Sequence, residues 1–310
     1  MLVVLAAGTS PARALSIPTV VQESGTKVTL LDIHFQDNLK GWTVGAAGTM
    51  LQTVDGGKQW FLLPRRTNVL LTAVTFIDDQ RGWVIGQNGM ILHSSDGGKK
   101  WGPQYSGTNS NLYGIFFLTP SMGWIVGSRG TILHTQDGGA NWEDQTSLVT
   151  ADLFGIQFVN DKIGWAVGAL GVILATTDGG QNWVTQETQS PATFFDLSFS
   201  DPSVGWAVGT QGSIFQTLNG GKNWVDRTLP CGAPCIKPPD LVKIQFSDNL
   251  RGWIAGERGV ILFTRDAGFT WIEPEPIAKV SLYGLSFPDA QSGWAVGDNG
   301  TIVKLTSPIE

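Results

Sequence analysis

Short segments with apolar residues two positions apart recur along the chain. In the first of them, Ile33 and Phe35 stand eight and six residues before a Gly-Trp pair. An apolar period of two is typical of a half-buried β-strand. Six further phenylalanines hold the place of Phe35: Phe76, Phe117, Phe158, Phe199, Phe246 and Phe287. The pattern therefore predicts seven copies of one strand-based unit.

The unit repeats with an almost constant length. Its Gly-Trp pairs lie at residues 41–42, 82–83, 123–124, 164–165, 205–206, 252–253 and 293–294. The steps between these pairs are 41 residues, except one of 47. Each pair opens a G-W-x-Φ-G-x-x-G pattern, which predicts a second strand and a tight turn where Gly45 or Gly48 takes a positive φ. An apolar third strand follows, and D-G-G-x-x-W then predicts a hairpin into a fourth strand.

Four strands per unit are typical of a β-propeller blade. The seventh copy ends after Leu305 without a D-G-G-x-x-W motif, whereas the segment 17–22 precedes the first copy and stands outside the repeat. We therefore predict an all-β, seven-bladed β-propeller of four-stranded blades, whose ring is closed when the N-terminal strand completes the last blade. The expected blades are residues 26–66, 67–107, 108–148, 149–189, 190–236, 237–277, and 278–310 together with 17–24.

Composition limits the classes of function. The chain has 310 residues, a net charge of −6 and a pI near 5.1. An acidic chain of this kind is not expected to bind nucleic acid through a broad basic face. Its 40 glycines show no collagen-like period, so they are expected at turns.

The first residues have the features of an export signal. An apolar run at residues 2–7 is followed by Ala12-Arg13-Ala14, which fits a small-x-small cleavage site. We expect residues 1–14 to be the remnant of this signal and residues 15–310 to form one propeller; the alternative is a frayed N-terminus. No later stretch has the roughly 18–20 apolar residues that cross a bilayer. We therefore expect an exported protein with no transmembrane segment of its own.

The longest step in the repeat contains both cysteines of the chain. Cys231 and Cys235 stand in the segment LPCGAPC, which we expect to be a loop insertion. In an oxidising compartment this spacing allows a small disulfide loop, and the alternative is a pair of free thiols. Two thiols without a nearby histidine do not make a zinc site.

The hairpin motif S/T-x-D-x-G-x-x-W resembles the Asp-box, or BNR repeat, of sialidases and sortilin-type receptors. Its combination with G-W-x-V-G-x-x-G over residues 17–305 more closely resembles the photosystem II stability and assembly factor family. That resemblance implies a non-enzymatic protein of the periplasm or thylakoid lumen that binds protein subunits of a membrane complex, with photosystem II as the expected complex. The arginine patch associated with that role does not carry over cleanly, because the nine arginines fall at several repeat positions.

A catalytic site is not predicted. A sialidase needs a tyrosine nucleophile with carboxylate partners, but Tyr113 and Tyr283 share one repeat position, which suggests strand packing. His93 and His134 also share a position, and the other copies fill it with unrelated residues, so a blade-surface site is favoured over a metal ligand. We expect no catalytic residues, no cofactor and no metal.

The variable residues of the G-x-x-G turns are the predicted binding surface. Equivalent turns of a propeller lie on one face, and variable loops on a rigid scaffold often carry function. We hypothesise that Arg129 and Arg258 contact a protein partner; the alternative is plain solvated turns. The further candidates are Gln87, Asn88 and Gln211 on the same turns, the pair Arg65 and Arg66, and Arg227 beside the insertion.

Two classes of function remain open. One is an assembly factor or scaffold for an exported-side membrane complex, in which the chain acts as a monomeric propeller. The other is a periplasmic or extracellular Asp-box propeller that binds a glycan or a surface protein.

Overall fold

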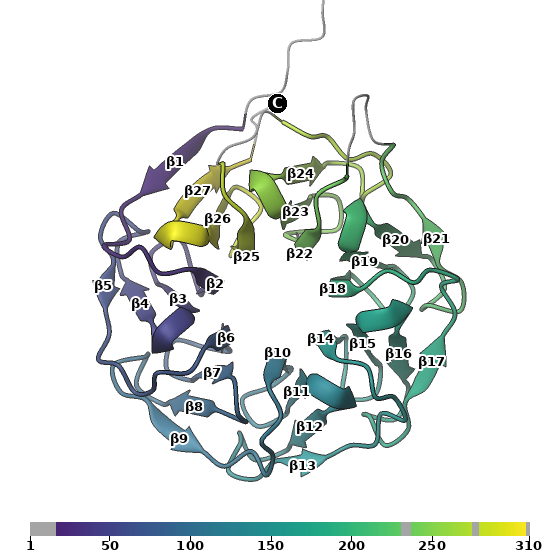
Figure 1. Ribbon diagram of the computed structural model, residues 1–310, viewed down its shortest axis with the longest axis horizontal. Coiled ribbons are helices and arrows are strands. Elements are labelled where there is room, and N and C mark those ends of the chain that lie inside the picture. Colours follow the sequence, from purple (N-terminus) through teal and green to yellow (C-terminus); the bar gives the residue numbers. More distant parts are fainter. Residues whose placement is uncertain (1–16, 231–236, 275–278, 308–310) are drawn as a thin grey trace, which may run out of the picture.

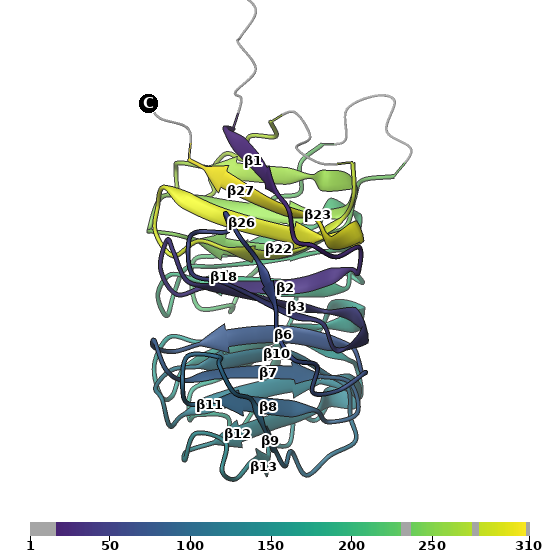
Figure 2. The ribbon, with the colours of Figure 1, turned by 90° about the vertical axis from the view of Figure 1, so that its left-hand side faces the viewer.

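The computed structural model describes residues 17–230, 237–274 and 279–307. Seven antiparallel β-sheets surround a central axis as the blades of a ring (Figure 1), and the side view shows a thick disc (Figure 2). The predicted all-β, seven-bladed propeller is confirmed. We number the blades 1 to 7 from the one that contains β2. The predicted export signal at residues 1–14, and Cys231 and Cys235, lie outside the described residues.

Each blade runs from an innermost strand at the axis to an outermost strand at the rim. The innermost strands are β2 (Leu30–Phe35), β6 (Leu71–Phe76), β10 (Leu112–Phe117), β14 (Leu153–Phe158), β18 (Phe194–Phe199), β22 (Leu241–Phe246) and β25 (Leu282–Ser286). The second strands are β3 (Gly41–Gly45), β7 (Gly82–Gly86), β11 (Gly123–Gly127), β15 (Gly164–Gly168), β19 (Gly205–Gly209), β23 (Gly252–Gly256) and β26 (Ser292–Gly297). The third strands are β4 (Met50–Thr53), β8 (Ile91–Ser94), β12 (Ile132–Thr135), β16 (Ile173–Thr176), β20 (Ile214–Thr217), β24 (Ile261–Thr264) and β27 (Ile302–Thr306). The outermost strands are β1 (Thr19–Gln22), β5 (Phe61–Leu62), β9 (Gly102–Gln104), β13 (Glu143–Asp144), β17 (Val184–Gln186) and β21 (Val225–Asp226).

The N-terminal strand closes the ring, as the sequence predicts. β1 pairs antiparallel with β27, with Thr19 opposite Leu305 and Gln22 opposite Ile302. The first strand of the chain is thus the outermost strand of blade 7, and the two ends of the chain share one sheet (Figure 1). Closure leaves every blade with a neighbour on both sides, so no blade face is left open.

Blade 6 departs from the predicted four strands. Its sheet contains β22, β23 and β24, and the described part of the fourth strand consists of a single bridge between Phe263 and Ile272. Two backbone hydrogen bonds join these residues, at 2.9 and 2.8 Å. Within the described residues, blade 6 is therefore completed by one residue pair where other blades form a short strand.

Stacked aromatic rings join neighbouring blades. The tryptophan of each Gly-Trp pair is buried, and its ring meets the repeated phenylalanine of the next blade. In blade 3, Trp124 stacks on Phe158 with ring centroids 3.6 Å apart, and around the closure Trp294 stacks on Phe35 at the same separation. The glycine before each tryptophan leaves room for the phenylalanine of its own blade, because a Cβ on Gly41 would lie 2.6 Å from the Phe35 ring. The repeat thus encodes the blade interfaces.

The D-G-G-x-x-W hairpins are held by their own polar side chains. In blade 3, the Asp137 carboxylate accepts hydrogen bonds from the Thr135 hydroxyl and from the amide of Asn141, each at 2.9 Å. These donors hold the pKa of Asp137 below its usual value. The hairpin also binds the blade before it, because Gln104 Nε2 donates to the carbonyl of Gly138 at 3.0 Å. The predicted structural role of the motif is confirmed.

Candidate protein-binding surface

The G-x-x-G turns all lie on one face of the disc, which we call the turn face (Figures 1 and 2). Six of them form short 3-10 helices: η1 (Ala46–Gly48), η2 (Ser128–Gly130), η3 (Ala169–Gly171), η4 (Thr210–Gly212), η5 (Glu257–Gly259) and η6 (Asp298–Gly300). In the first turn Gly48 has a φ of 68°, whereas Gly45 is extended. Of the two predicted positions for a positive φ, the second glycine is therefore the correct one.

The residue before this second glycine is also left-handed in every blade. These residues are Ala47, Asn88, Arg129, Leu170, Gln211, Arg258 and Asn299, and all are exposed. For residues other than glycine and asparagine, this conformation costs roughly 1–2 kcal/mol. The turn therefore presents one side chain per blade to solvent on a fixed backbone.

The predicted site residues fall into two separate regions. Gln87, Asn88, Arg129, Gln211 and Arg258 lie on the turn face, whereas Arg65 and Arg66 follow the outermost strand β5 and Arg227 follows β21. Within the turn face, η2 belongs to blade 3 and η5 to blade 6. Because three steps around the ring separate their blades, Arg129 and Arg258 cannot act as one basic cluster.

The turn of Arg129 is fixed to the neighbouring turn. The amide of Arg129 donates to the Asp152 carboxylate at 2.9 Å, and the amide of Ala169 donates to the carbonyl of the same Asp152 at 2.8 Å. The turn also packs on the loop that leaves blade 3, since a Cβ on Gly130 would clash with the carbonyl of Val149. Arg129, the Val149 loop and the η3 turn are thereby held side by side.

Two leucines in these segments are exposed and strained. Leu148 is 83% exposed with a φ of 61°, and Leu170 is 79% exposed with a φ of 59°. At the position of Leu148, the loops before blades 1 and 3 have Gly25 and Gly107, which adopt the same conformation without a Cβ. Strained backbone conformations cluster at sites that bind other molecules, and exposed apolar side chains that lie close together mark interaction surfaces. We call Arg129, Leu148 and Leu170 the blade 3–4 patch.

Replacing Leu148 with glycine is expected to stabilise the folded protein while weakening its binding to any partner that contacts the Leu148 side chain. The substitution removes the left-handed strain and adds backbone entropy to the unfolded chain, so we expect a net gain of about 0.5–1 kcal/mol. Urea unfolding followed by circular dichroism measures this change. A loss of stability would show that the Leu148 side chain supports the fold.

The patch was only partly visible in the sequence. Arg129 and the turn that carries Leu170 were recognised from the repeat. Leu148 was missed because it is the last residue of the predicted blade 3, outside the repeated motifs, although a leucine at a position where other loops have glycine was an available signal. The contact of these three segments depends on how blades 3 and 4 pack.

A central cavity of about 590 Å³ is lined by the innermost strands. It contains a group of three charged side chains, Asp32 on β2, Asp196 on β18 and Lys243 on β22. Lys243 Nζ lies 3.9 Å from a carboxylate oxygen of each aspartate. Each aspartate also accepts an amide hydrogen bond from the following blade, Asp32 from Val74 at 2.9 Å and Asp196 from Ile244 at 3.0 Å. The charges thus connect three blades across the inner wall.

Burial controls the protonation of this group. It raises the pKa of Asp32 and of Asp196, and the Lys243 ammonium opposes that rise. Burial alone would lower the pKa of Lys243, but the two carboxylates outweigh it, so its pKa is raised above 10.5. With the lysine charged, the carboxylates have a compensating partner at neutral pH.

Two of the remaining titratable candidates pack against aromatic rings, Tyr113 between blades 3 and 4 and His134 within blade 3. Tyr113 contacts Phe154 with ring centroids 5.2 Å apart, as expected for a shared strand position. His134 is only 8% exposed and stacks on Trp124, so the predicted blade-surface site is wrong for this histidine. The tryptophan that repeats in every blade leaves a flat apolar surface on which the imidazole ring packs.

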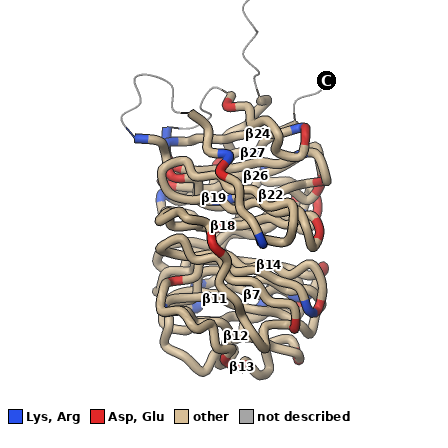
Figure 3. The backbone as a smooth tube through the Cα atoms, turned by 90° about the vertical axis from the view of Figure 1, so that its right-hand side faces the viewer, with Lys and Arg blue, Asp and Glu red and all other residues tan. Residues whose placement is uncertain are grey.

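The described residues offer no group of three His, Cys, Asp or Glu side chains that could hold a metal ion. Within the same residues, no helix is long and apolar enough to cross a membrane. On the side of the ring that carries β13, β14, β18 and β24, the described Lys and Arg positions are scattered along the backbone and interspersed with Asp and Glu positions (Figure 3).

The comparisons with known proteins concern family and fold. The model of the family described as Photosynthesis system II assembly factor YCF48 matches residues 14–107, 103–191 and 184–280. None of the curated proteins compared matches the chain in sequence.

Solved structures share the propeller over almost the whole chain. The structure described as YCF48 bound to D1 peptide has a TM-score of 0.77 at 21% identity, over 96% of this chain and 99% of that chain. YCF48 from Cyanidioschyzon merolae has a TM-score of 0.75 at 23% identity, over 93% of this chain and 98% of that chain. A streptogramin B lyase has a TM-score of 0.79 at 15% identity, over 94% and 97% of the two chains. Likeness at such identities concerns the fold alone.

Proposed function

Because the chain belongs to the photosystem II assembly factor YCF48 family, we propose that it is an exported, non-catalytic propeller that binds a protein subunit of a membrane complex of the photosystem II type. The fold of this chain is similar to that of a YCF48 with a bound D1 peptide, which supports a peptide segment as the ligand. The blade 3–4 patch is the surface that we assign to this contact.

One observation carries the assignment. Leu148 and Leu170 are exposed apolar side chains that keep a costly backbone conformation on the turn face. Exposed to water, these side chains do not stabilise the folded protein. Each one that a partner buries fully contributes roughly 1.5–3 kcal/mol to the free energy of binding. The strain is then offset in the complex.

The patch suits an extended peptide with apolar side chains and a carboxylate. The leucines provide apolar contact, and the Arg129 guanidinium can donate two parallel hydrogen bonds to a carboxylate. The backbone hydrogen bonds to Asp152 hold the turn before binding, so little conformational entropy is lost on contact. The arrangement therefore favours recognition of a peptide over chemistry on it.

Binding of a D1-derived peptide to the full chain, measured by isothermal calorimetry, tests the proposal. The double substitution Leu148→Asp/Leu170→Asp is expected to weaken binding at least roughly tenfold, because a few buried anchors dominate peptide interfaces. The control is Leu39→Asp/Leu250→Asp, which changes two exposed leucines, 57% and 58% exposed, in loops on the opposite face. Equal weakening by both double variants would contradict the patch.

Charge reversal at Arg129 and at Arg258 distinguishes a binding site confined to the blade 3–4 patch from one that extends to blade 6. Arg129→Glu is expected to weaken peptide capture, whereas Arg258→Glu tests whether the contact extends to blade 6. Loss with Arg258→Glu alone would move the site away from the patch. Capture of a glycan in place of a peptide would support the second class of function, an Asp-box propeller that binds extracellular ligands.

A further inference from the structure

The outer rim of blades 7 and 1 is apolar where other blades are not. Val20 and Val21 on β1 are 61% and 66% exposed, and Phe61 and Leu62 on β5 are 53% and 68% exposed. By strand register the same two positions are Gly102 and Pro103, Glu143 and Asp144, Val184 and Thr185, and Val225 and Asp226 in blades 2 to 5. Among the described outermost strands, β1 and β5 are thus the two with a large apolar residue at both positions.

These two strands are neighbours, and hydrogen bonds join them. Gln22 Nε2 donates to the carbonyl of Gly56 at 2.9 Å, and Trp60 Nε1 donates to Gln22 Oε1 at 3.3 Å. Gln22 directly follows Val21, and Trp60 directly precedes Phe61. Figure 1 shows β1 and β5 along the same part of the rim. The four exposed apolar residues Val20, Val21, Phe61 and Leu62 therefore lie on two neighbouring outermost strands of the rim, and we call them the rim patch.

The rim patch is bordered by basic side chains in a chain that is acidic overall. Lys27, Lys58, Arg65 and Arg66 are all exposed in the segments that adjoin β1 and β5. The acidic residues of the same segments, 17–31 and 54–70, are Glu23 and Asp55. Asp55 is bound within its own hairpin, where its carboxylate accepts hydrogen bonds from Thr53 at 2.9 Å and from the amide of Gln59 at 3.0 Å.

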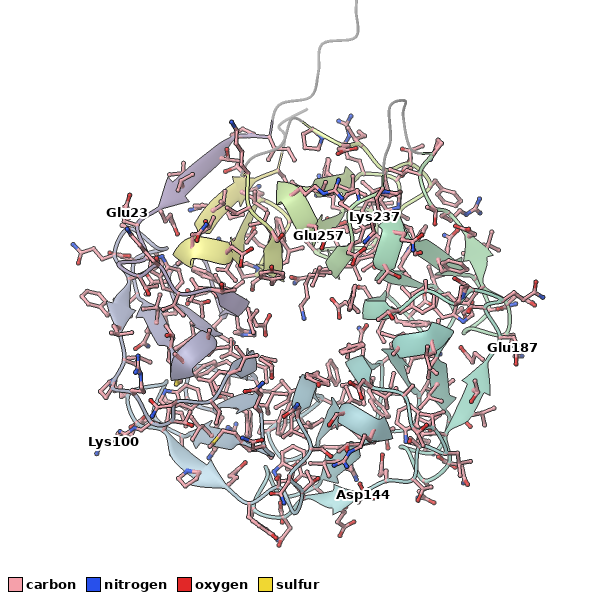
Figure 4. All side chains as sticks on the ribbon, in the orientation of Figure 1. Glu23, Lys100, Asp144, Glu187, Lys237 and Glu257 are labelled. Carbon is pink, nitrogen blue, oxygen red and sulfur yellow. The ribbon has the colours of Figure 1, made fainter. Side chains whose placement is uncertain are left out.

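Glu23 lies at the outer edge of the ring (Figure 4). Four basic against two acidic side chains give the segments 17–31 and 54–70 a combined charge of +2, whereas the chain as a whole carries −6. Because these segments are positively charged, the partner of the rim patch is expected to carry negative charge.

We propose that the rim patch docks the protein edge-on to a bilayer surface that contains anionic lipids. Exposed Phe, Leu and Val side chains enter the boundary between headgroups and acyl chains, while the flanking Lys and Arg side chains meet lipid phosphates. One basic residue near an anionic surface contributes about 1 kcal/mol, or roughly fivefold in affinity. The docking surface shares no residue with the blade 3–4 patch, so it stands independently of the proposed function.

A second copy of the chain is a less suitable occupant. In a symmetric dimer the same patch would face itself, which would bring Lys58, Arg65 and Arg66 of both copies together. Like charges across an interface oppose association. An anionic bilayer, by contrast, offers acyl chains to the apolar residues and phosphates to the basic residues.

Co-flotation of the full chain with lipid vesicles tests this docking. We expect binding to vesicles of equal parts phosphatidylglycerol and phosphatidylcholine, with at least roughly tenfold weaker binding to phosphatidylcholine alone. Phe61→Asp/Leu62→Asp should reduce binding at least roughly tenfold. Arg65→Glu/Arg66→Glu should reduce it by roughly 25-fold or more and flatten its dependence on salt.

The matched control is Val184→Asp/Thr185→Asp, which places two aspartates at the same blade positions on β17, away from the basic border. It should float like the unchanged protein, and circular dichroism of every variant checks that the fold is kept. Equal binding by all variants, equal binding to both vesicle types, or a concentration-dependent dimer in light scattering that the Phe61→Asp/Leu62→Asp change abolishes would each overturn the proposal.

Discussion

Replacing Trp124 by alanine is expected to lower the free energy of unfolding by about 3–5 kcal/mol, the range for large aromatic residues removed from a core. The Trp124 ring has no exposed surface, stacks on Phe158 of blade 4 at 3.6 Å, and donates from Nε1 to the carbonyl of Gly179 at 3.3 Å. The change therefore removes the aromatic contact between blades 3 and 4. Urea unfolding followed by far-ultraviolet circular dichroism measures the loss.

The matched control lies in the same blade. Trp142 belongs to the D-G-G-x-x-W motif, is only partly buried and meets the edge of Phe117 at a longer centroid distance of 6.0 Å. Trp142→Ala should cost less than half as much, about 1–2 kcal/mol. If both substitutions cost the same, the stack between blades is not the dominant contact.

Replacing Lys243 by methionine is expected to lower the free energy of unfolding by about 3 kcal/mol at neutral pH, because two buried carboxylates lose their counter-charge. The side chains of Asp32 and Asp196 are 10% and 14% exposed, so water compensates little. Methionine keeps the length of the lysine stem, which separates loss of charge from loss of volume. Thermal and urea unfolding at several pH values measure the effect.

The pH dependence follows from the direction of the pKa shifts. Burial raises the folded-state pKa of both carboxyl groups, so the folded state binds their protons more tightly than the unfolded chain does. The deficit of Lys243→Met should therefore shrink as the pH falls from about 8 to about 5. In the unchanged protein the raised pKa of Lys243 gives stability that is present below pH 10.5 and lost as the pH rises through the folded-state pKa.

The triple variant Asp32→Asn/Asp196→Asn/Lys243→Met is the control, because it removes all three charges together. It should recover most of the lost stability and show little dependence on pH between about 5 and 8. A deficit of Lys243→Met that stays constant or grows on acidification would show that unpaired carboxylates are not its cause.

The seven-bladed architecture could be predicted because each blade contains the same residues at the same spacing. Each Gly-Trp pair marks a second strand, and the phenylalanine six residues earlier supplies the ring on which the tryptophan of the previous blade stacks. The missing motif after Leu305 and the extra segment at 17–22 predicted the closure by β1. These features depend on residue type and spacing, which are visible without coordinates.

Blade 6 and the charged group escaped prediction for different reasons. The hairpin of blade 6 carries Trp271 like the others, yet among the residues that the structure describes after it only Ile272 pairs with β24. Asp32, Asp196 and Lys243 hold one repeat position, but their meeting requires the ring curvature and a register shift in each innermost strand, such as that between Leu241 and Lys243. The spacing of motifs along the chain does not show the short pairing in blade 6 or the register shifts of the innermost strands.

The number of blades, the blade interfaces, the ring closure and the common face of the variable turns could all be predicted from the amino-acid sequence, because they follow from a repeated pattern of apolar, aromatic and glycine residues. Only the tertiary structure decided which variable residues act together. It separated Arg129 from Arg258 by three blades and held the turn of Arg129 against the segments that carry Leu148 and Leu170. It also joined β1 and β5, from opposite sides of the ring closure, along one part of the rim. The physical reason is that a repeat fixes where each residue lies within its blade, whereas neighbours between blades depend on how the ring closes.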